Sequence, residues 1–513
     1  MTALHGTNLI EGRESALGTA SFRAVAPTNG ESLEPEYKDA TSAEIDRAVT
    51  LADSCAESFA CVPPERIAQL LDSVASEIEA LGDQLIERAA QETALPVERL
   101  KGERARTTNQ LRLFADLVRD GSWKDLRMDP ALPDRKPLRR PDLRRTMIPI
   151  GPVAVWAASN FPLAFSVAGG DTASALAASC PVIVKAHPGH PGTSELTARA
   201  IGKAIAAVGL PPGIFALLHG ASPEVSLELV RHPKIAAGAF TGSLRAGRAL
   251  FDAASRRPIP IPFFAEMGSV NPVFLLSEAL TERGGAIAEG LFQSVTLGVG
   301  QFCTCPGLAV AVEGPELGQF AGTLRSQFQQ SAPGAMLTAS IARSYCEAAA
   351  RLASIPGVAA LGAKEPADPL LQGAPILFEA SDQTFLEHEE LRRETFGPAT
   401  VLVRCQSVAR MLEVARNLEG SLTATIHGTR RDLEKNRPLL SLLPRKAGRL
   451  VFNGFPTGVE VCASMQHGGP YPATSDPRFT SVGAAAIQRF SRPVCFQDCT
   501  PEFLPPELQT LSE

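Results

Sequence analysis

The clearest β-strand signal of this 513-residue chain is the uncharged stretch Pro152-Val153-Ala154-Val155-Trp156-Ala157-Ala158. Further short apolar runs follow it at residues 182–186, 215–219, 235–240 and 262–266. Helix-length stretches separate these runs, for instance residues 193–208 and 243–254. Strands that alternate with helices indicate the crossover connections that parallel neighbours need. The sequence therefore predicts an α/β fold whose parallel sheet carries a nucleotide site at the carboxyl ends of its strands.

The segments on either side of this region have different residue patterns. Thr41 and Glu44 have the spacing of a capping box, and apolar residues recur at helical spacing through residues 45–59, 67–86 and 111–118. Residues 121–146 are rich in Pro and Arg, so a helix is not expected there, and both a linker and a protruding hairpin fit. Beyond Asn271 we expect a second α/β unit that runs to about residue 455.

Composition narrows the classes of partner and compartment. The net charge is -6, from 49 basic and 55 acidic residues without a basic block, so nucleic acid is not an expected partner. Ten cysteines are scattered along the chain and the start lacks the pattern of a signal peptide, which favours the cytoplasm. Residues 147–170 carry no charge, but Pro and Gly interrupt them, so we expect a strand and a loop there and no membrane span.

The heptapeptide Gly300-Gln301-Phe302-Cys303-Thr304-Cys305-Pro306 sets a cysteine behind a glycine that we expect to be flexible. A thiol attacks as thiolate, and nearby backbone N–H groups or a helix N-terminus lower its pKa. The stretch predicts a nucleophile loop, and two buried core cysteines are the alternative interpretation. No further Cys or His lies close in sequence, so we predict no metal site.

Several separated motifs resemble the aldehyde dehydrogenase superfamily in composition and in order, over roughly residues 30–490. The motifs are Ser159-Asn160-Phe161-Pro162, Val184-Lys185, Phe240-Thr241-Gly242-Ser243, Glu266-Met267-Gly268, Gly300-Gln301-Phe302-Cys303, Glu394-Thr395-Phe396-Gly397-Pro398 and Asn453-Gly454-Phe455-Pro456. The resemblance implies a Rossmann-like cofactor-binding domain (residues 1–120 and 147–265), an α/β catalytic domain (266–455) and an oligomerisation element (121–146 and 470–495). It also implies a homodimer or homotetramer.

The same resemblance implies the roles of three catalytic residues. Cys303 matches the nucleophile that adds to an aldehyde carbon, and Asn160 with the Cys303 N–H matches the donors that hold the resulting oxyanion. Glu266 matches the base that activates water to hydrolyse the thioester, which argues against transfer to CoA. Because Glu266 ends an apolar strand, we expect burial to raise its pKa. A further hypothesis is that Cys305 forms a strained, reversible disulfide bridge with Cys303, which would make activity sensitive to oxidation.

The cofactor groove is expected from residues that follow the predicted strands and from one later motif. Residues 242–247 follow a strand and open a helix, so their N–H groups suit a pyrophosphate, although the spacing is not the dinucleotide fingerprint. The expected cofactor-binding residues are Lys185, Gly220, Gly242, Ser243, Glu394 and Phe396.

Position 188 bears on the choice between NADP and NAD. NAD-preferring relatives commonly place Glu three residues after this Lys, whereas here Pro188 stands there. Lys185 and Arg245 are candidate partners of a 2′-phosphate, so NADP is favoured over NAD.

Within the superfamily, residues 185–195, 264–273, 465–474 and 488–497 resemble the α-ketoglutarate semialdehyde dehydrogenases, which oxidise 2,5-dioxopentanoate to 2-oxoglutarate. A bacterial long-chain aldehyde dehydrogenase shares many of the residues in these stretches and is the second alternative. A catalytically silent binding or structural relative is the third alternative. The sequence assigns no arginine to the distal end of the substrate. We therefore predict an NAD(P)-dependent oxidation of a small semialdehyde.

Overall fold

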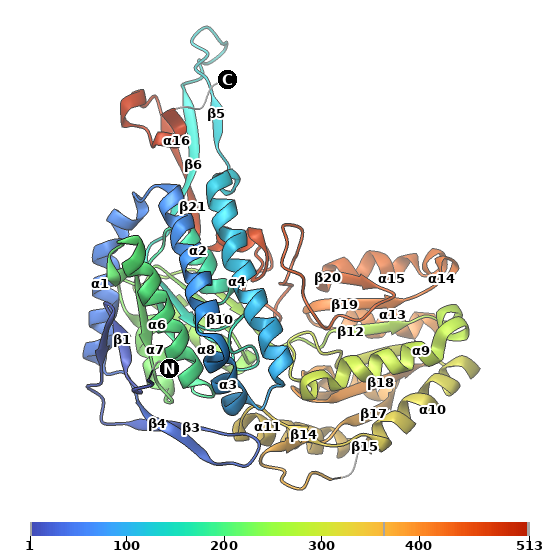
Figure 1. Cartoon of the computed structure of the whole chain (residues 1–513). Helices are drawn as coiled ribbons and strands as arrows, with labels where there is room; N and C mark the ends of the chain where they lie inside the picture. The colour runs from blue at the N-terminus through green and yellow to red at the C-terminus, as the bar shows by residue number, and fades with distance from the viewer. Residues whose placement is uncertain (1–2, 363–364, 510–513) are drawn as a thin grey trace.

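The computed structural model describes residues 3–362 and 365–509. Figure 1 shows two α/β halves side by side, with a narrow arm rising from the first half. Each half contains a seven-stranded sheet. The predicted α/β class is thereby confirmed.

The first sheet has the order β11-β10-β7-β8-β9-β1-β2. Its five parallel strands are β7 (Val153–Trp156), β8 (Val182–Lys185), β9 (Phe215–Leu218), β10 (Ala237–Thr241) and β11 (Phe263–Glu266). The antiparallel strands β1 (Asn8–Ile10) and β2 (Arg13–Ser15) complete it. The predicted parallel sheet is confirmed, and its order reverses between β7 and β10, where such sheets open a ligand crevice.

Helices cover both faces of the first sheet. One face packs against α2 (Pro64–Ala80), α4 (Val97–Asp120), α5 (Gly170–Ala177) and α6 (Pro191–Val208), and the other against α1 (Ser42–Ala60), α7 (Pro223–Arg231) and α8 (Leu244–Ser255). The Thr41 capping box is present. The continuous pattern at residues 67–86 is in fact divided between α2 and α3 (Gly82–Thr93), because Gly82 adopts a positive φ of 57°.

The second sheet has the order β15-β17-β18-β13-β12-β19-β20 and is parallel except for β15. Its strands are β12 (Pro272–Leu275), β13 (Leu308–Val312), β15 (Ala359–Gly362), β17 (Ile376–Ser381), β18 (Ala399–Cys405), β19 (Ser421–His427) and β20 (Ala447–Phe452). The helices of this half are α9 (Ser277–Thr296), α10 (Pro315–Gln330), α11 (Ala339–Ala353), α12 (Asp382–Glu387), α13 (Val408–Asn417), α14 (Arg430–Lys435) and α15 (Arg437–Leu442). The expected second α/β unit is present.

The Pro- and Arg-rich segment forms the arm, so of the two interpretations the hairpin is correct. Strand β6 (Leu143–Pro149) pairs with β5 (Arg127–Asp129) and with β21 (Ser491–Gln497), and α16 (Pro506–Gln509) lies beside them (Figure 1). The segment expected to join the arm at residues 470–495 divides in two. Only its end pairs with β6, whereas residues 473–475 hydrogen-bond to the end of β11.

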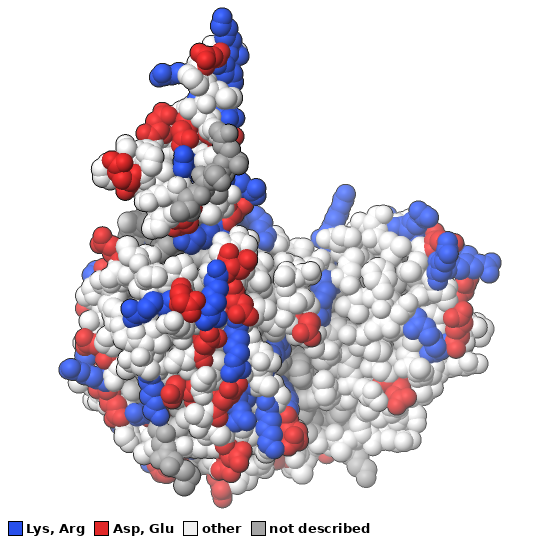
Figure 2. Space-filling view, turned by 45° about the horizontal axis from the view of Figure 1, so that its top comes forward, with Lys and Arg blue, Asp and Glu red and all other residues white. Residues whose placement is uncertain are grey.

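Short pairings complete the chain: β3 (Ser21–Val25) with β4 (Ser32–Lys38), and β14 (Gly334–Ala335) with β16 (Gln372–Gly373). Figure 2 shows acidic and basic side chains mixed over the visible face, with a basic tip on the arm. Of the helices in the described ranges, none has the length and apolarity of a membrane span.

Candidate active site

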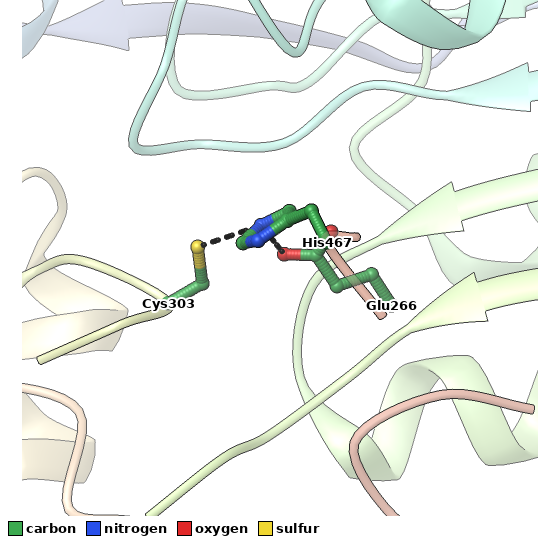
Figure 3. A group of neighbouring side chains, drawn as sticks. All are labelled: Glu266, Cys303 and His467. Atoms are coloured by element: carbon green, nitrogen blue, oxygen red, sulfur yellow. Dashed lines mark hydrogen bonds and ion pairs between the residues drawn. The ribbon is translucent and has the colours of Figure 1, made fainter. Parts of the chain in front are cut away.

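Three reactive side chains from distant parts of the chain meet between the two halves. Glu266 ends β11, Cys303 lies in the loop between α9 and β13, and His467 lies in the long loop that follows β20. The Cys303 Sγ is 3.5 Å from the His467 Nε2, which is 3.1 Å from the Glu266 Oε1. Figure 3 shows the thiol and the carboxylate both directed at the imidazole. A single ring nitrogen of His467 thus faces both the thiol and the carboxylate, so it donates to Glu266 when it carries a proton and accepts from Cys303 when it does not.

The loop that carries Cys303 is held by a glycine turn and by hydrogen bonds from Asn271. Gly300 has a positive φ of 65°, and a Cβ on it would lie 2.2 Å from the carbonyl oxygen of Gly397. The side-chain amide of Asn271 donates to the carbonyls of Cys303 (2.9 Å) and Cys305 (3.0 Å). Both this conformation and the close approach to Gly397 require glycine at the turn, and the flexibility of Gly300 stays a prediction.

The thiol of Cys303 is protonated at rest. Burial raises its pKa well above the ordinary value, the negative charge of Glu266 adds to the rise, and Arg106 opposes it. The sequence interpretation expected backbone dipoles to lower this pKa, and here loss of hydration outweighs them. Attack by Cys303 consequently needs a base within reach, and His467 is in place.

Glu266 is ionised more readily than the sequence interpretation expected. Burial raises its pKa, but the charge of His467 in its protonated form and the hydrogen bonds from His467 and Ser481 outweigh burial, so the net pKa is lowered once His467 holds a proton. The Ser481 hydroxyl donates to Oε2 at 2.6 Å. The expected rise overlooked these two donors, which reach Glu266 from about 200 residues away in sequence.

His467 is a candidate functional residue that sequence reasoning missed. The side chain is buried, at 1% exposure, and its ring contacts Phe165 with centroids 6.2 Å apart. It stands in a quoted stretch, Met465-Gln466-His467-Gly468-Gly469. A single histidine in a loop carries no spacing signal, so only the fold connects it to Cys303.

Asn160 lies beside the nucleophile loop, as expected. Its buried side-chain amide donates to the carbonyl of Gln301 at 3.0 Å, which leaves its second N–H for another acceptor. Within the described ranges, no acceptor pairs with the backbone N–H of Cys303. Both donors are thus available for a developing oxyanion.

The ligand atoms of Glu266, Cys303 and His467 lie within 4.8 Å of one another, a spacing that a metal ion also accepts. The absence of a metal therefore stays a prediction.

Cys305 differs from Cys303 in its surroundings. It is free and buried, its Sγ faces the carbonyls of Val295 and Gly397, and burial raises its pKa to about 12. The reversible bridge between Cys303 and Cys305 also stays a prediction.

The carboxyl ends of the parallel strands meet at one edge, as the register Trp156 to Lys185 to Leu218 shows. Lys185 is buried, and burial lowers its pKa to about 8. Its ammonium group has no hydrogen bond or ion pair with the described residues. Gly220 is buried nearby, where a Cβ would lie 2.8 Å from the side chain of Val225. Packing alone therefore explains that glycine.

Gly242 and Ser243 link β10 to α8. The Ser243 hydroxyl caps the helix by accepting from the N–H of Ala246 at 3.3 Å. Residues 242–246 are exposed at the same edge of the sheet as Lys185. An exposed helix N-terminus at this position suits the negative charge of a pyrophosphate.

Glu394 and Phe396 lie in the loop before β18, and both are half-buried. Burial raises the pKa of Glu394 to about 7. Its Oε2 lies 2.7 Å from the point that a Cβ on Gly268 would occupy, so the glycine after Glu266 lets this carboxylate approach the reacting centre.

The model of the aldehyde dehydrogenase family matches residues 14–471. The chain belongs to the aldehyde dehydrogenase family. An α-ketoglutaric semialdehyde dehydrogenase 2 of Azospirillum brasilense is 51% identical over 99% of this chain and 97% of its own length. An α-ketoglutaric semialdehyde dehydrogenase of Acinetobacter baylyi is 45% identical over 99% of this chain and 97% of its own length. The structure of a γ-glutamyl-γ-aminobutyraldehyde dehydrogenase from Burkholderia cenocepacia superposes with a TM-score of 0.82 at 20% identity, covering 97% of each chain.

These comparisons confirm the resemblance found in the motifs, the fold, and the class of enzyme, an NAD(P)-dependent aldehyde dehydrogenase. The residues at the strand ends fit such a cofactor. Lys185 is a buried cation with no hydrogen bond or ion pair to the residues that the structure describes, and α8 presents an exposed N-terminus, so an aldehyde dehydrogenase cofactor would find a charge and N–H groups for its phosphates. Glu394 would accept from ribose hydroxyls.

Proposed function

We propose that this aldehyde dehydrogenase oxidises 2,5-dioxopentanoate to 2-oxoglutarate, with Cys303 as nucleophile. The chain of contacts from the Cys303 Sγ through the His467 Nε2 to the Glu266 Oε1 carries the chemical part of the proposal. The substrate follows from the names of the two relatives that match nearly the whole chain.

The first step is addition of the thiol to the aldehyde. The unprotonated Nε2 of His467 takes the proton of the Cys303 thiol, and the N–H that results donates to Glu266, whose negative charge stabilises the imidazolium. The sulfur then forms a bond with the aldehyde carbon, and the carbonyl oxygen becomes an oxyanion. The Asn160 amide and the Cys303 N–H hold that oxygen, and removing one such donor typically costs ~10²–10³ in rate.

The second step releases the acid. A nicotinamide dinucleotide, when bound, supplies the electron acceptor for oxidation of the adduct to a thioester. Glu266, which its lowered pKa keeps ionised near neutral pH, accepts a proton from a water molecule that attacks the thioester carbon. The carbon–sulfur bond breaks and the carboxylic acid leaves, losing its proton to solvent. The imidazolium of His467 returns its proton to the Cys303 sulfur, and Glu266 releases the proton of the water molecule to solvent. Hydrolysis through Glu266 sets this reaction apart from transfer to CoA.

NADP is the proposed cofactor, with NAD as the alternative. Pro188 leaves no carboxylate at the position where NAD-preferring relatives commonly have one, and Lys185 and Arg245 are the cations for a 2′-phosphate. Lys185, Gly220, Gly242, Ser243, Glu394 and Phe396 remain the proposed cofactor-binding residues. The domain boundaries given above, a homodimer or homotetramer formed through the arm, and a cytoplasmic location also remain proposals.

Initial rates with 2,5-dioxopentanoate, succinic semialdehyde and a long-chain aldehyde, each with NAD and with NADP, test this function. We expect the largest kcat/KM for 2,5-dioxopentanoate with NADP. Cys303→Ser should lose turnover with every aldehyde, while the control Cys305→Ser keeps it. A preference for the long-chain aldehyde, or no oxidation by the wild type despite bound nucleotide, would favour the fatty-aldehyde enzyme or the silent relative.

A further inference from the structure

Arg106 is a half-buried cation without an ion-pair partner among the residues that the structure describes. Its guanidinium lies over the rings of Phe161 and Phe165, 5.7 and 5.3 Å from their centroids. The Nε and Nη2 atoms are buried and lack a hydrogen-bond acceptor, and no ion pair joins Arg106 to any residue in the described ranges. A buried charged donor without an acceptor is costly, so a ligand that supplies one gains affinity.

The acid nearest along the helix is engaged through one of its two carboxylate oxygens, and the other oxygen does not reach Arg106. Glu103 lies one turn before Arg106 on α4, and its Oε1 accepts from the N–H groups of Leu163 (2.8 Å) and Ala164 (3.0 Å). Arg99, two turns before Arg106 on the same face, donates to the carbonyl of Asn160 at 2.8 Å. Arg106, in contrast, has two buried donors, Nε and Nη2, without an acceptor among the described residues.

Arg106 also lies near the reacting atoms. Phe165, which packs against its guanidinium, contacts the ring of His467. Burial raises the pKa of Cys303, and the positive charge of Arg106 opposes that rise. The cation therefore lies one aromatic ring away from His467, which contacts the Cys303 thiol.

A second arginine near Cys303 has a different task. Arg449 on β20 donates through Nη1 and Nη2 to the carbonyls of Gly458 and Pro456, so it fastens the loop after β20. Of the two, only Arg106 has a whole edge of its guanidinium without acceptors.

We infer that Arg106 binds the distal carboxylate of an oxo-acid substrate while Cys303 attacks the aldehyde at the other end. Nε and Nη2 share one edge of the guanidinium, which pairs with the two oxygens of a carboxylate through parallel hydrogen bonds. The inference rests on the proposed function and deepens it by naming the specificity-determining residue. The rings of Phe161 and Phe165 fix the plane of the guanidinium.

The test compares 2,5-dioxopentanoate with pentanal, which has the same length but no carboxylate, at saturating cofactor. Arg106→Gln should lower the ratio of their kcat/KM values by about 10²-fold, mainly through KM, because charge-assisted hydrogen bonds are lost. Arg106→Lys, which keeps the charge but not the pair of parallel donors on one edge of the guanidinium, should lower this ratio by about 10-fold. The control Arg112→Gln removes a cation that pairs with Glu79 on the exposed side of the same helix and should keep the wild-type ratio.

Protection of Cys303 gives a readout without turnover. Glutarate should slow alkylation of Cys303 by iodoacetamide in the wild type and in Arg112→Gln, but not in Arg106→Gln with an unchanged melting temperature. A wild-type ratio and full protection in Arg106→Gln would overturn the role of Arg106 and leave the proposed function standing. Failure of the wild type to oxidise 2,5-dioxopentanoate would instead overturn the proposed function and this inference with it.

Discussion

The reacting centre and the cofactor side of this molecule differ in how their polar groups are satisfied. Glu266 has two side-chain donors, His467 contacts both Cys303 and Glu266, and Asn160 is bonded to the nucleophile loop. On the cofactor side, the ammonium of Lys185 has no partner among the described residues. The comparison teaches that the protein itself orients Cys303, His467 and Glu266, whereas Lys185 on the proposed cofactor side keeps a charge for a ligand to satisfy, as Arg106 does on the proposed substrate side.

The comparison is tested most severely at His467. Because burial raises the pKa of Cys303, His467→Asn should leave the thiol without a base and lower kcat/KM by about 10²–10³-fold. Alkylation of Cys303 by iodoacetamide should slow at pH 7 and rise about tenfold per pH unit, following the thiolate fraction. The control His232→Asn removes a ring that pairs with Asp46 outside the site. Wild-type alkylation by His467→Asn would contradict preorganisation of this centre.

A smaller effect is expected on the cofactor side. Lys185→Met should raise KM for NADP by about tenfold and change KM for NAD less, since one charge-assisted bond to a phosphate is lost. Burial lowers the pKa of Lys185 to about 8, so its charge is present below that pH and lost above it. Wild-type KM for NADP should therefore rise above pH 8.

Lys203, exposed on α6, provides the matched control as Lys203→Met. This variant should retain the pH dependence of the wild type, and Lys185→Met should lack it. Equal KM values for NADP in wild type and Lys185→Met would remove Lys185 from the cofactor side.

The elements that a local pattern encodes were predictable from the sequence. The five parallel strands begin and end within two residues of their expected bounds, because short apolar runs between helices leave few alternatives. The Thr41 cap was predictable for the same reason. The division at Gly82 was not, because the apolar spacing continues through it and only the positive φ breaks the helix.

The site was predictable where a motif lies next to a strand end, as for Asn160, Lys185 and Glu266. It was not predictable where function depends on a contact across the fold. His467 reaches Glu266 over 201 residues, and Asn271 holds the carbonyl of Cys303 over 32. The pKa directions of Cys303 and Glu266 failed for the same reason, since each depends on partners that only the tertiary structure supplies.

The claim that Glu266 completes a preorganised nucleophile and hydrolysis centre is tested most directly by rapid mixing of Glu266→Gln with cofactor and 2,5-dioxopentanoate. The account predicts a single burst of reduced cofactor, about one equivalent per active site, followed by arrest with a thioester on Cys303 that mass spectrometry detects. Continued turnover at the wild-type rate, with no accumulated thioester, would contradict it.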